Sequence, residues 1–461
     1  MSPGSPNAVP AHDTRYAWTV LLILAAMALM VTYVETMVLP AFSNFESFFH
    51  VTAASTIAWI LSAYLLVGVV VTPIFGKLGD VYGKKRMLMI AMGVYAVAVS
   101  VAGFTPQIGA TLGLSRPDQI YGLIAVRAVQ GVGMAMFPLG FAMLPEVFPP
   151  ARVGQAQGLL SGMFAAGAAA GLVGGGWIAQ AYGWQFTYHT VIPIAITVLL
   201  LAAIVVRESE IRHARAIDVP GVVSLGAGLT FLMLGITEGA YWGWTRLSAV
   251  SFYGVPWGVP EFLLLAGGIF AFFLYWEPRA PNPVVSFPSL KERNIWVSNV
   301  NGVFIGMTMF LLFTVLIILG EYPSPGFHLS EFQAGLVLVP AVLSMMVTGP
   351  FLGRSISRFG PRPVMLAGFV LIIVGALGLW GFNRSTLEVA LFGVPVMVGN
   401  VAVLISMTNV IVLSVDPRTV GIQTGMNQMF RNLGSAVGPV LVTSILASYG
   451  FTEHFPGFSF Q

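Results

Sequence analysis

Long apolar segments constrain this chain more than any other feature of its sequence. A helix that crosses the roughly 30 Å hydrocarbon core of a bilayer needs about 20 apolar residues. The sequence holds thirteen such stretches, at residues 17–40, 54–75, 87–106, 120–144, 154–180, 185–206, 219–240, 260–277, 295–320, 332–353, 363–382, 387–414 and 420–449. Most of the proline and charged residues lie in the short segments between them. The pattern predicts an all-α integral membrane protein with about 13 transmembrane helices.

Composition supports the same fold class and excludes several functions. Apolar residues make up 57% of the 461 and charged residues 8%, whereas a soluble domain carries about 25% charged residues. Such a chain could not cover its surface in water, so we expect it to be surrounded by membrane lipid. A net charge of +3 is too small to indicate a nucleic-acid partner. The absence of cysteine removes disulfides, thiolate metal sites and cysteine nucleophiles, and we expect neither metal nor cofactor.

The positions of Lys and Arg predict the orientation of the spans. Cytoplasmic loops of membrane proteins are enriched in these residues. With the N-terminus inside, sixteen of them fall on inner segments and three, Arg116, Arg246 and Arg384, on outer loops. We therefore expect a multi-pass protein of the cell membrane with a cytoplasmic N-terminus.

Two internal repeats divide the spans. The segment from Pro73 through Gly76 and Gly83 matches the segment from Pro350 through Gly353 and Gly360 at a constant spacing of 277 residues. A second match, at a spacing of 267, places four glycines of one span on four of another, namely Gly154, Gly158, Gly167 and Gly171 on Gly421, Gly425, Gly434 and Gly438. Parallel repeats of this kind are found in membrane transporters.

The repeats predict an organisation of six, then two, then five spans. We divide the chain into a cytoplasmic tail (1–16), an N-terminal six-helix bundle (17–206), a two-span insert with flanking cytoplasmic loops (207–294), a C-terminal bundle (295–450) and an outer tail (451–461). The second bundle lacks a sixth span. A fragment and a natural truncation both remain open as explanations.

Several motifs together resemble the major facilitator superfamily. The run from Gly76 through Asp80 to Arg86 resembles its cytoplasmic loop signature, and the span plan resembles its fourteen-span drug:proton antiporter branch without the last span. Segment 123–133 resembles the fourth-span arginine motif of that branch, and segment 35–40 its first-span acidic motif. In the fifth span Leu172 follows Gly171 where the family carries proline, a departure that bears on antiport.

The resemblance implies two pseudo-symmetric bundles around a central cavity, and a proton-coupled exporter of lipophilic or amphipathic drugs rather than an enzyme. Glu35 is the carboxylate well inside a span, where a charge costs at least about 2.5 kcal/mol, and is the candidate proton carrier. Arg127 cannot lose its proton, so burying it demands a partner. The family implies that Glu35 and Arg127 couple protonation to substrate release. It also implies that the inner loop acts as a gate, through Gly76, Asp80, Gly83, Lys84 and Arg86.

Two further groups of residues have less specific signals. Small residues at helical spacing predict close helix packing, for which the candidates are Gly167, Gly171, Gly175, Gly438 and Pro439. Candidates for the substrate cavity are Met30, Tyr33, Tyr64, Gln130, Met134, Asn400, Asn427 and Arg431, since methionine and aromatic side chains suit adaptable binding. Arg431 near Asn427 allows for an anionic group on the substrate.

Two other functions stay open. The first is a facilitator-fold carrier of a lipid, siderophore or metabolite with different coupling, which Leu172 favours. The second is a cofactor-bearing membrane enzyme subunit, which the lack of paired membrane histidines and of a phosphate-binding loop disfavours. The partners we expect are a small amphipathic substrate, protons and membrane lipid, with the chain acting as a monomer.

Overall fold

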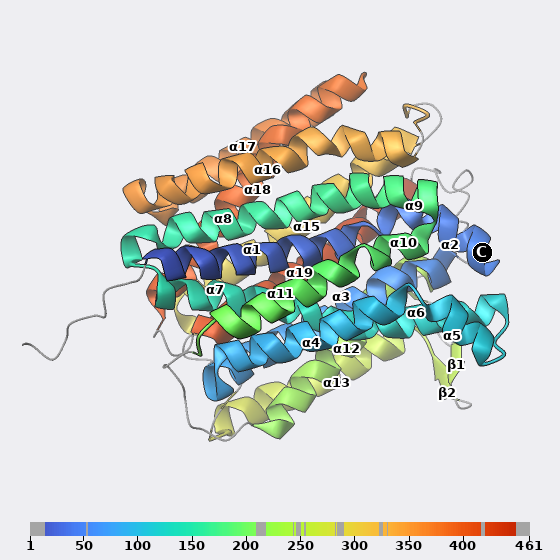
Figure 1. Ribbon diagram of the computed structural model, residues 1–461, viewed down its shortest axis with the longest axis horizontal. Helices are drawn as coiled ribbons and strands as arrows, with labels where there is room; N and C mark the ends of the chain where they lie inside the picture. Colours follow the sequence, from blue (N-terminus) through green and yellow to red (C-terminus); the bar gives the residue numbers. More distant parts are fainter. Residues whose placement is uncertain are drawn as a thin grey trace, which may run out of the picture.

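The chain folds into a bundle of long helices that run roughly along one axis (Figure 1). The computed structural model describes residues 14–51, 54–208, 218–242, 244–245, 250–252, 255–281, 283, 290–321, 326–329, 331–415 and 420–448. The ends of both predicted tails and much of the predicted loops around the insert lie outside these residues.

The first six predicted spans are all helical. They correspond to α1 (Thr14–Thr36) with η1 (Leu39–Ala41), α3 (Ala54–Tyr82), α4 (Lys84–Ala102), α6 (Arg116–Gln130) with η2 (Gly131–Ala135) and α7 (Met136–Val147), α8 (Pro150–Ala170) with η3 (Gly171–Gly175) and α9 (Gly176–Tyr182), and α10 (Trp184–His189) with α11 (Val191–Val205). Two short helices, α2 (Phe42–Phe49) and α5 (Thr105–Thr111), lie between spans.

The remaining seven predicted spans are helical too. They are α12 (Val219–Trp242), α13 (Val259–Trp276), which runs into η4 (Glu277–Arg279), α15 (Arg293–Glu321), α16 (Glu331–Phe359), α17 (Pro361–Gly381), α18 (Thr386–Ser414) and α19 (Val420–Ser448). A two-stranded antiparallel hairpin, β1 (Val250–Phe252) and β2 (Val255–Trp257), precedes α13.

Among the described residues, twelve helical segments are long and apolar enough to cross a membrane. The thirteenth predicted span, α19, is a helix of 29 residues but is not one of the twelve. Its middle is polar, and the polar side chains there are buried: Gln423, Asn427, Gln428 and Asn432. The sequence therefore predicted the helix correctly, but α19 differs from the other spans because it buries polar groups against protein.

The two sequence repeats correspond to repeated helix contacts. Gly167 of α8 and Gly171, the first residue of η3, lie against α1, and Gly434 and Gly438 of α19 lie against α15. At its other end each helix crosses to the opposite half. Gly158 of α8 packs on Gly349 of α16, while Gly425 of α19 packs on Thr72 and Pro73 of α3. Small residues allow this close approach of backbones, so the halves meet along two equivalent seams.

Both repeats also turn between their second and third spans in the same way. Gly83 joins α3 to α4 at φ 107°, and Gly360 joins α16 to α17 at φ 83°. Side chains other than hydrogen rarely tolerate such backbone angles. The matched glycines of the two loops are thus explained by one backbone conformation.

The insert packs where the two halves meet rather than on one of them. Its helices α12 and α13 form the edge of the bundle opposite α16 and α17 (Figure 1). An apolar cluster joins Leu225 and Leu229 of α12 and Phe273 of α13 to Val69 of α3 and Met426 of α19. Since α3 and α19 form one of the two seams, the insert covers that seam.

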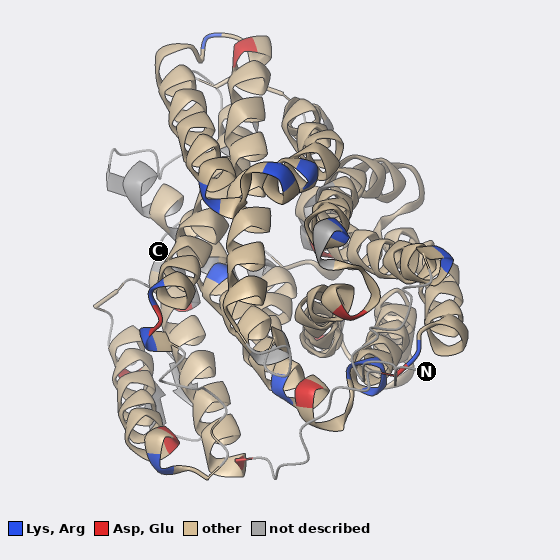
Figure 2. Cartoon of the chain, turned by 90° about the vertical axis from the view of Figure 1, so that its left-hand side faces the viewer, with Lys and Arg blue, Asp and Glu red and all other residues tan. Residues whose placement is uncertain are grey.

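Basic residues are spread over the end of the bundle that Figure 2 faces. They lie at the starts of α4, α8, α15 and α17 and at the ends of α3 and α16. At this end the hydroxyl of Tyr16 accepts the backbone N–H of Arg207 at 2.9 Å, and the Arg207 guanidinium lies 4.7 Å from the centroid of the Tyr16 ring. These contacts tie the start of α1 to the segment that follows α11. The segments predicted to be cytoplasmic therefore gather at one end.

Candidate functional site

Arg127 is sealed inside the N-terminal half. Its side chain has 0% exposure. Nε donates to the carbonyl oxygen of Ile60 at 2.9 Å, and Nη1 donates to the carbonyl oxygen of Val34 at 3.4 Å and to Oε1 of Gln130 at 3.0 Å. The guanidinium also lies over the ring of Tyr64, 4.4 Å from its centroid. Arg127 therefore ties α1, α3 and α6 together.

Glu35 lies one residue beyond Val34 on α1 and is 8% exposed. Among the described residues Arg127 donates to carbonyl and amide oxygens and not to the Glu35 carboxylate. The carboxylate nevertheless interacts electrostatically with two cations, Arg127 and Arg431. The sequence anticipated Arg127 as its partner; the arginine of the second half is an addition from the tertiary structure.

Arg431 of α19 lies at a small pocket between the halves. The pocket is lined by Pro138, Phe141, Thr408, Thr424, Asn427, Gln428 and Arg431, so α7 of the first half faces α18 and α19 of the second. The guanidinium donates to Oε1 of Gln428 and lies 5.7 Å from the ring centroid of Phe164 on α8. Unlike Arg127, it is partly exposed.

The other predicted cavity residues divide between this pocket and the protein interior. Asn427 lines the pocket, and its amide donates to the carbonyl oxygen of Ser298 at 2.9 Å. Asn400 is buried and bonds to its own helix at 3.4 Å. The buried residues Met30, Tyr64, Gln130 and Met134 belong to the packed interior of the first half, and Tyr33 is half-buried there. Met134 packs against Gly68 of α3. The spacing of these residues in the sequence could not show which of them line the pocket and which lie in the packed interior.

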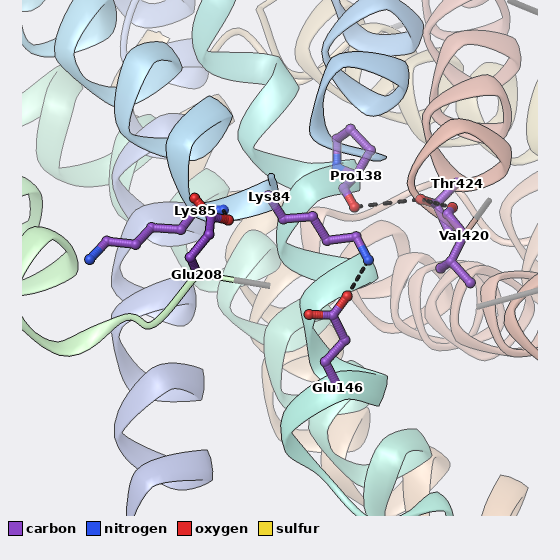
Figure 3. Close-up of polar contacts among 7 residues, drawn as sticks. All are labelled: Lys84, Lys85, Pro138, Glu146, Glu208, Val420 and Thr424. Atoms are coloured by element: carbon purple, nitrogen blue, oxygen red, sulfur yellow. Dashed lines mark hydrogen bonds and ion pairs between the residues drawn. The ribbon is translucent and has the colours of Figure 1, made fainter. Parts of the chain in front are cut away.

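The predicted gate loop contains a buried ion pair. Lys84 is 1% exposed and pairs through Nζ with Oε1 of Glu146 at the end of α7. Glu208, beyond α11, accepts the backbone N–H groups of Lys85 and Arg86 at 3.0 and 3.1 Å. A carboxylate at a helix N-terminus satisfies free N–H groups and the helix dipole. Figure 3 shows Lys84 paired with Glu146 and Glu208 beside Lys85, with the two lysine side chains pointing in different directions.

Asp80, also in this loop, is buried at the end of α3, next to the seam with α19. Gly76 faces Gly425 across the same seam. The hydroxyl of Thr424 donates to the carbonyl oxygen of Pro138 at 3.4 Å (Figure 3). The ends of the two halves beside the predicted gate loop are therefore in direct contact in this conformation.

The fifth span departs from a regular α-helix where the family proline is absent. Residues Gly171–Gly175 form a π-helical turn that joins α8 to α9. Gly175 lies against Met37, the residue after α1, and Leu172 packs into the apolar core of the second half. π turns inside α-helices are rare and often occur at functional sites. A widened turn thus takes the place that proline has in the family. Pro439 follows Gly438 within α19.

Two buried polar features escaped the reasoning from sequence. Asn409 of α18 donates to Oε1 of Gln157 of α8 at 3.3 Å, which links the halves inside the membrane. Glu238 of α12, which lies near the aromatic residues of an outer interface by sequence, is 1% exposed. A polar side chain near a helix end carries no local signal that distinguishes burial from exposure, so neither could have been found from spacing.

Comparison with known proteins agrees with this architecture. A family model described as Major Facilitator Superfamily matches residues 24–439. The chain is 27% identical to a tetracenomycin C resistance and export protein of Streptomyces glaucescens over 95% of this chain and 78% of that one. It is 26% identical to a multidrug resistance protein B homolog of Mycobacterium tuberculosis over 93% and 76%.

Solved structures share the fold. The human organic anion transporter MFSD10 superposes with a TM-score of 0.65 at 15% identity, covering 97% of this chain and 96% of that one. The proton:xylose symporter XylE superposes with a TM-score of 0.63 at 13% identity, covering 97% and 93%.

Proposed function

The chain belongs to the Major Facilitator Superfamily and is a transporter, and on that premise we propose that it exports lipophilic or amphipathic compounds in exchange for protons by alternating access. The relatives named for resistance and export support the substrate class. The observation that carries the proposal is Glu35, a carboxylate inside the first span that lies within the electrostatic reach of Arg127 and Arg431. We place the protein in the cell membrane as a monomer, with its N-terminus in the cytoplasm.

In this proposal Glu35 takes up a proton when its side of the cavity faces outward and releases it inward. Arg127 has a fixed charge and backbone-anchored hydrogen bonds. Its positive charge therefore attracts the ionised carboxylate of Glu35 throughout the cycle. Protonation of Glu35 has to overcome this attraction. Arg431 belongs to the other half, so rocking of the halves changes the distance between its charge and Glu35. That change is what couples the proton to the conformational cycle.

The inner loop is proposed as the gate of this cycle. The support is the contact of the two halves at Gly76 and Gly425, beside the buried Asp80 and the Lys84–Glu146 pair. An inward-open state would have to separate α3 from α19. Gly83 and Arg86 set the turn and the helix start that hold this loop in place.

The test of proton coupling is Glu35→Gln, with Glu35→Asp as the matched control. In proteoliposomes with an imposed pH gradient, we expect Glu35→Gln to abolish uphill transport of a fluorescent amphipathic compound and to keep downhill exchange. Glu35→Asp retains the titratable group and should keep both. Unchanged uphill transport by Glu35→Gln would remove this residue as the coupling site.

One observation favours a second candidate, a carrier of a lipid, siderophore or metabolite with other coupling. Leu172 stands in the π turn where antiporters of the family carry proline. Measuring proton release when substrate is added to the purified protein separates the two. Release that varies with substrate concentration supports exchange, and its absence together with intact transport supports the second candidate.

A further inference from the structure

The charges near the pocket between the halves do not cancel. Of the described residues, Glu35 is the acidic group that acts on Arg431, and it also acts on Arg127. Arginine keeps its proton in proteins. One carboxylate therefore faces two permanent cations, which leaves one surplus positive charge even when Glu35 is ionised. Uncompensated charge inside a bilayer is unfavourable, so a counter-charge is expected there.

The positive charge that a ligand can reach belongs to Arg431 rather than to Arg127. The Arg127 guanidinium donates to two backbone carbonyls and an amide oxygen; its Nη2 is buried without a partner among the described residues, and the whole side chain is shielded from solvent. Arg431 makes one hydrogen bond among the described residues, to Gln428, although a guanidinium has five N–H donors. Its remaining donors lie at the pocket.

Most of the neighbouring donors are already engaged. Asn427 donates to the carbonyl oxygen of Ser298 at 2.9 Å and to Oδ1 of Asn299 at 3.2 Å, and Gln428 uses one of its two N–H groups on Asn432 at 2.8 Å. The hydroxyls of Thr408 and Thr424 donate to carbonyl oxygens of their own helices at 2.9 and 2.8 Å. An anion that entered the pocket would therefore meet Arg431 as its charged donor.

Aromatic rings face the same place. Phe164 lies beneath the Arg431 guanidinium, and its ring is 3.7 Å from the centroid of Phe137 and 6.5 Å from that of Phe141. Aromatic faces pack well on flat ring systems. A planar guanidinium also matches a carboxylate with two parallel hydrogen bonds. Charge and shape thus indicate one kind of ligand.

We propose that, when the halves move apart around this pocket, Arg431 binds the carboxylate of an aromatic, amphipathic substrate whose ring system packs against Phe141. The bound anion balances the surplus charge, so that the loaded site with Glu35 ionised is neutral. This rests on the proposed function, because it takes the pocket between the halves to lie on the transport path.

The test compares a matched pair of ligands, 1-pyrenebutyrate and its neutral amide, 1-pyrenebutyramide. Binding is measured by pyrene fluorescence to protein in nanodiscs of zwitterionic phosphatidylcholine. We expect the native protein to bind the carboxylate at least about tenfold more tightly than the amide. In Arg431→Gln that ratio should fall to about one while the affinity for the amide changes by less than about twofold, and Arg431→Lys should keep part of the preference.

Arg384→Gln is the control for general attraction of anions, because Arg384 is an exposed residue between α17 and α18. It should leave the ratio unchanged. Repeating the titration with anionic phosphatidylglycerol in the nanodiscs tests whether a lipid headgroup occupies the same site. Competition that depends on Arg431 would identify the lipid as the ligand and overturn the substrate assignment.

Equal affinity of the native protein for both ligands would overturn the proposal without any variant, and so would an unchanged ratio in Arg431→Gln. Failure of the proposed carboxylate binding by Arg431 can be told apart from failure of the proposed proton exchange. Proton-driven export of neutral compounds without a carboxylate preference would sink only the role of Arg431. A carboxylate preference that survives in a protein without pH-driven transport would sink only the exchange mechanism.

Discussion

The two halves share their helix packing but not their charges. Gly83 and Gly360 make the same turn, and the glycines of α8 and α19 make equivalent contacts. At the positions matching Asp80 and Lys84, however, the second half has Ser357 and Pro361. It carries no counterpart of the Lys84–Glu146 pair at that point. Backbone contacts must be repeated for the helices to fit, whereas charges need not be.

This difference teaches that the repeated positions are structural and the unrepeated ones are candidates for function. Glu35 and Arg127 lie in the first half, and Arg431 lies in the second. Each buried charge costs free energy and so requires a compensating role. Three comparisons, each between two residues of the same type, test this distinction between structural and functional positions. They follow in order of decreasing expected effect.

The strongest contrast should be between the two buried arginines. Arg127→Met leaves the carbonyls of Ile60 and Val34 without their donor, at about 1–3 kcal/mol for each buried group. We expect a large loss of thermal stability in detergent and no transport of any substrate. Arg431→Met removes one side-chain hydrogen bond from a partly exposed site, and because it also removes the surplus charge it should cost less than about 1 kcal/mol. Similar losses in the melting temperatures of the two variants would contradict this contrast.

A smaller contrast is expected between two adjacent lysines of the gate loop. Lys84→Met breaks a buried ion pair with Glu146 and should destabilise the protein by about 3 kcal/mol. Lys85 bonds from an exposed position to the carbonyl oxygen of Ala203 at 2.8 Å, so Lys85→Met should have little effect. Chemical denaturation of both variants measures this.

Adding Glu146→Gln to Lys84→Met removes the unpaired carboxylate and should restore most of the lost stability. If the double variant is as unstable as Lys84→Met, packing of the lysine stem rather than charge pairing accounts for the effect.

The smallest contrast is between the two turn glycines. Alanine at either place has to adopt a backbone conformation that costs about 1–3 kcal/mol. At Gly83 the new Cβ also meets the Glu208 carboxylate, whereas at Gly360 it meets no described atom within 4 Å. Gly83→Ala should therefore lower the melting temperature more than Gly360→Ala. The reverse order would show that Glu208 moves away without cost.

The sequence by itself determined the fold class, the positions of all thirteen long helices and the internal repeat. These features depend on local properties, namely the apolar length needed to cross a bilayer and the loop glycines that permit unusual backbone angles. It also identified Glu35, Arg127 and Arg431, because an ionisable side chain inside an apolar run is conspicuous without any knowledge of its neighbours.

Only the tertiary structure decided which of these groups act on one another. It placed Arg431 within reach of Glu35, put Met134 and Tyr64 in the packed interior instead of the pocket, and paired Lys84 with Glu146. Glu146 and Glu208 were not among the candidates from the sequence. The reason is physical: burial and pairing depend on which helix faces lie side by side, and residues 62 positions apart, as Lys84 and Glu146 are, carry no local sign that they will meet.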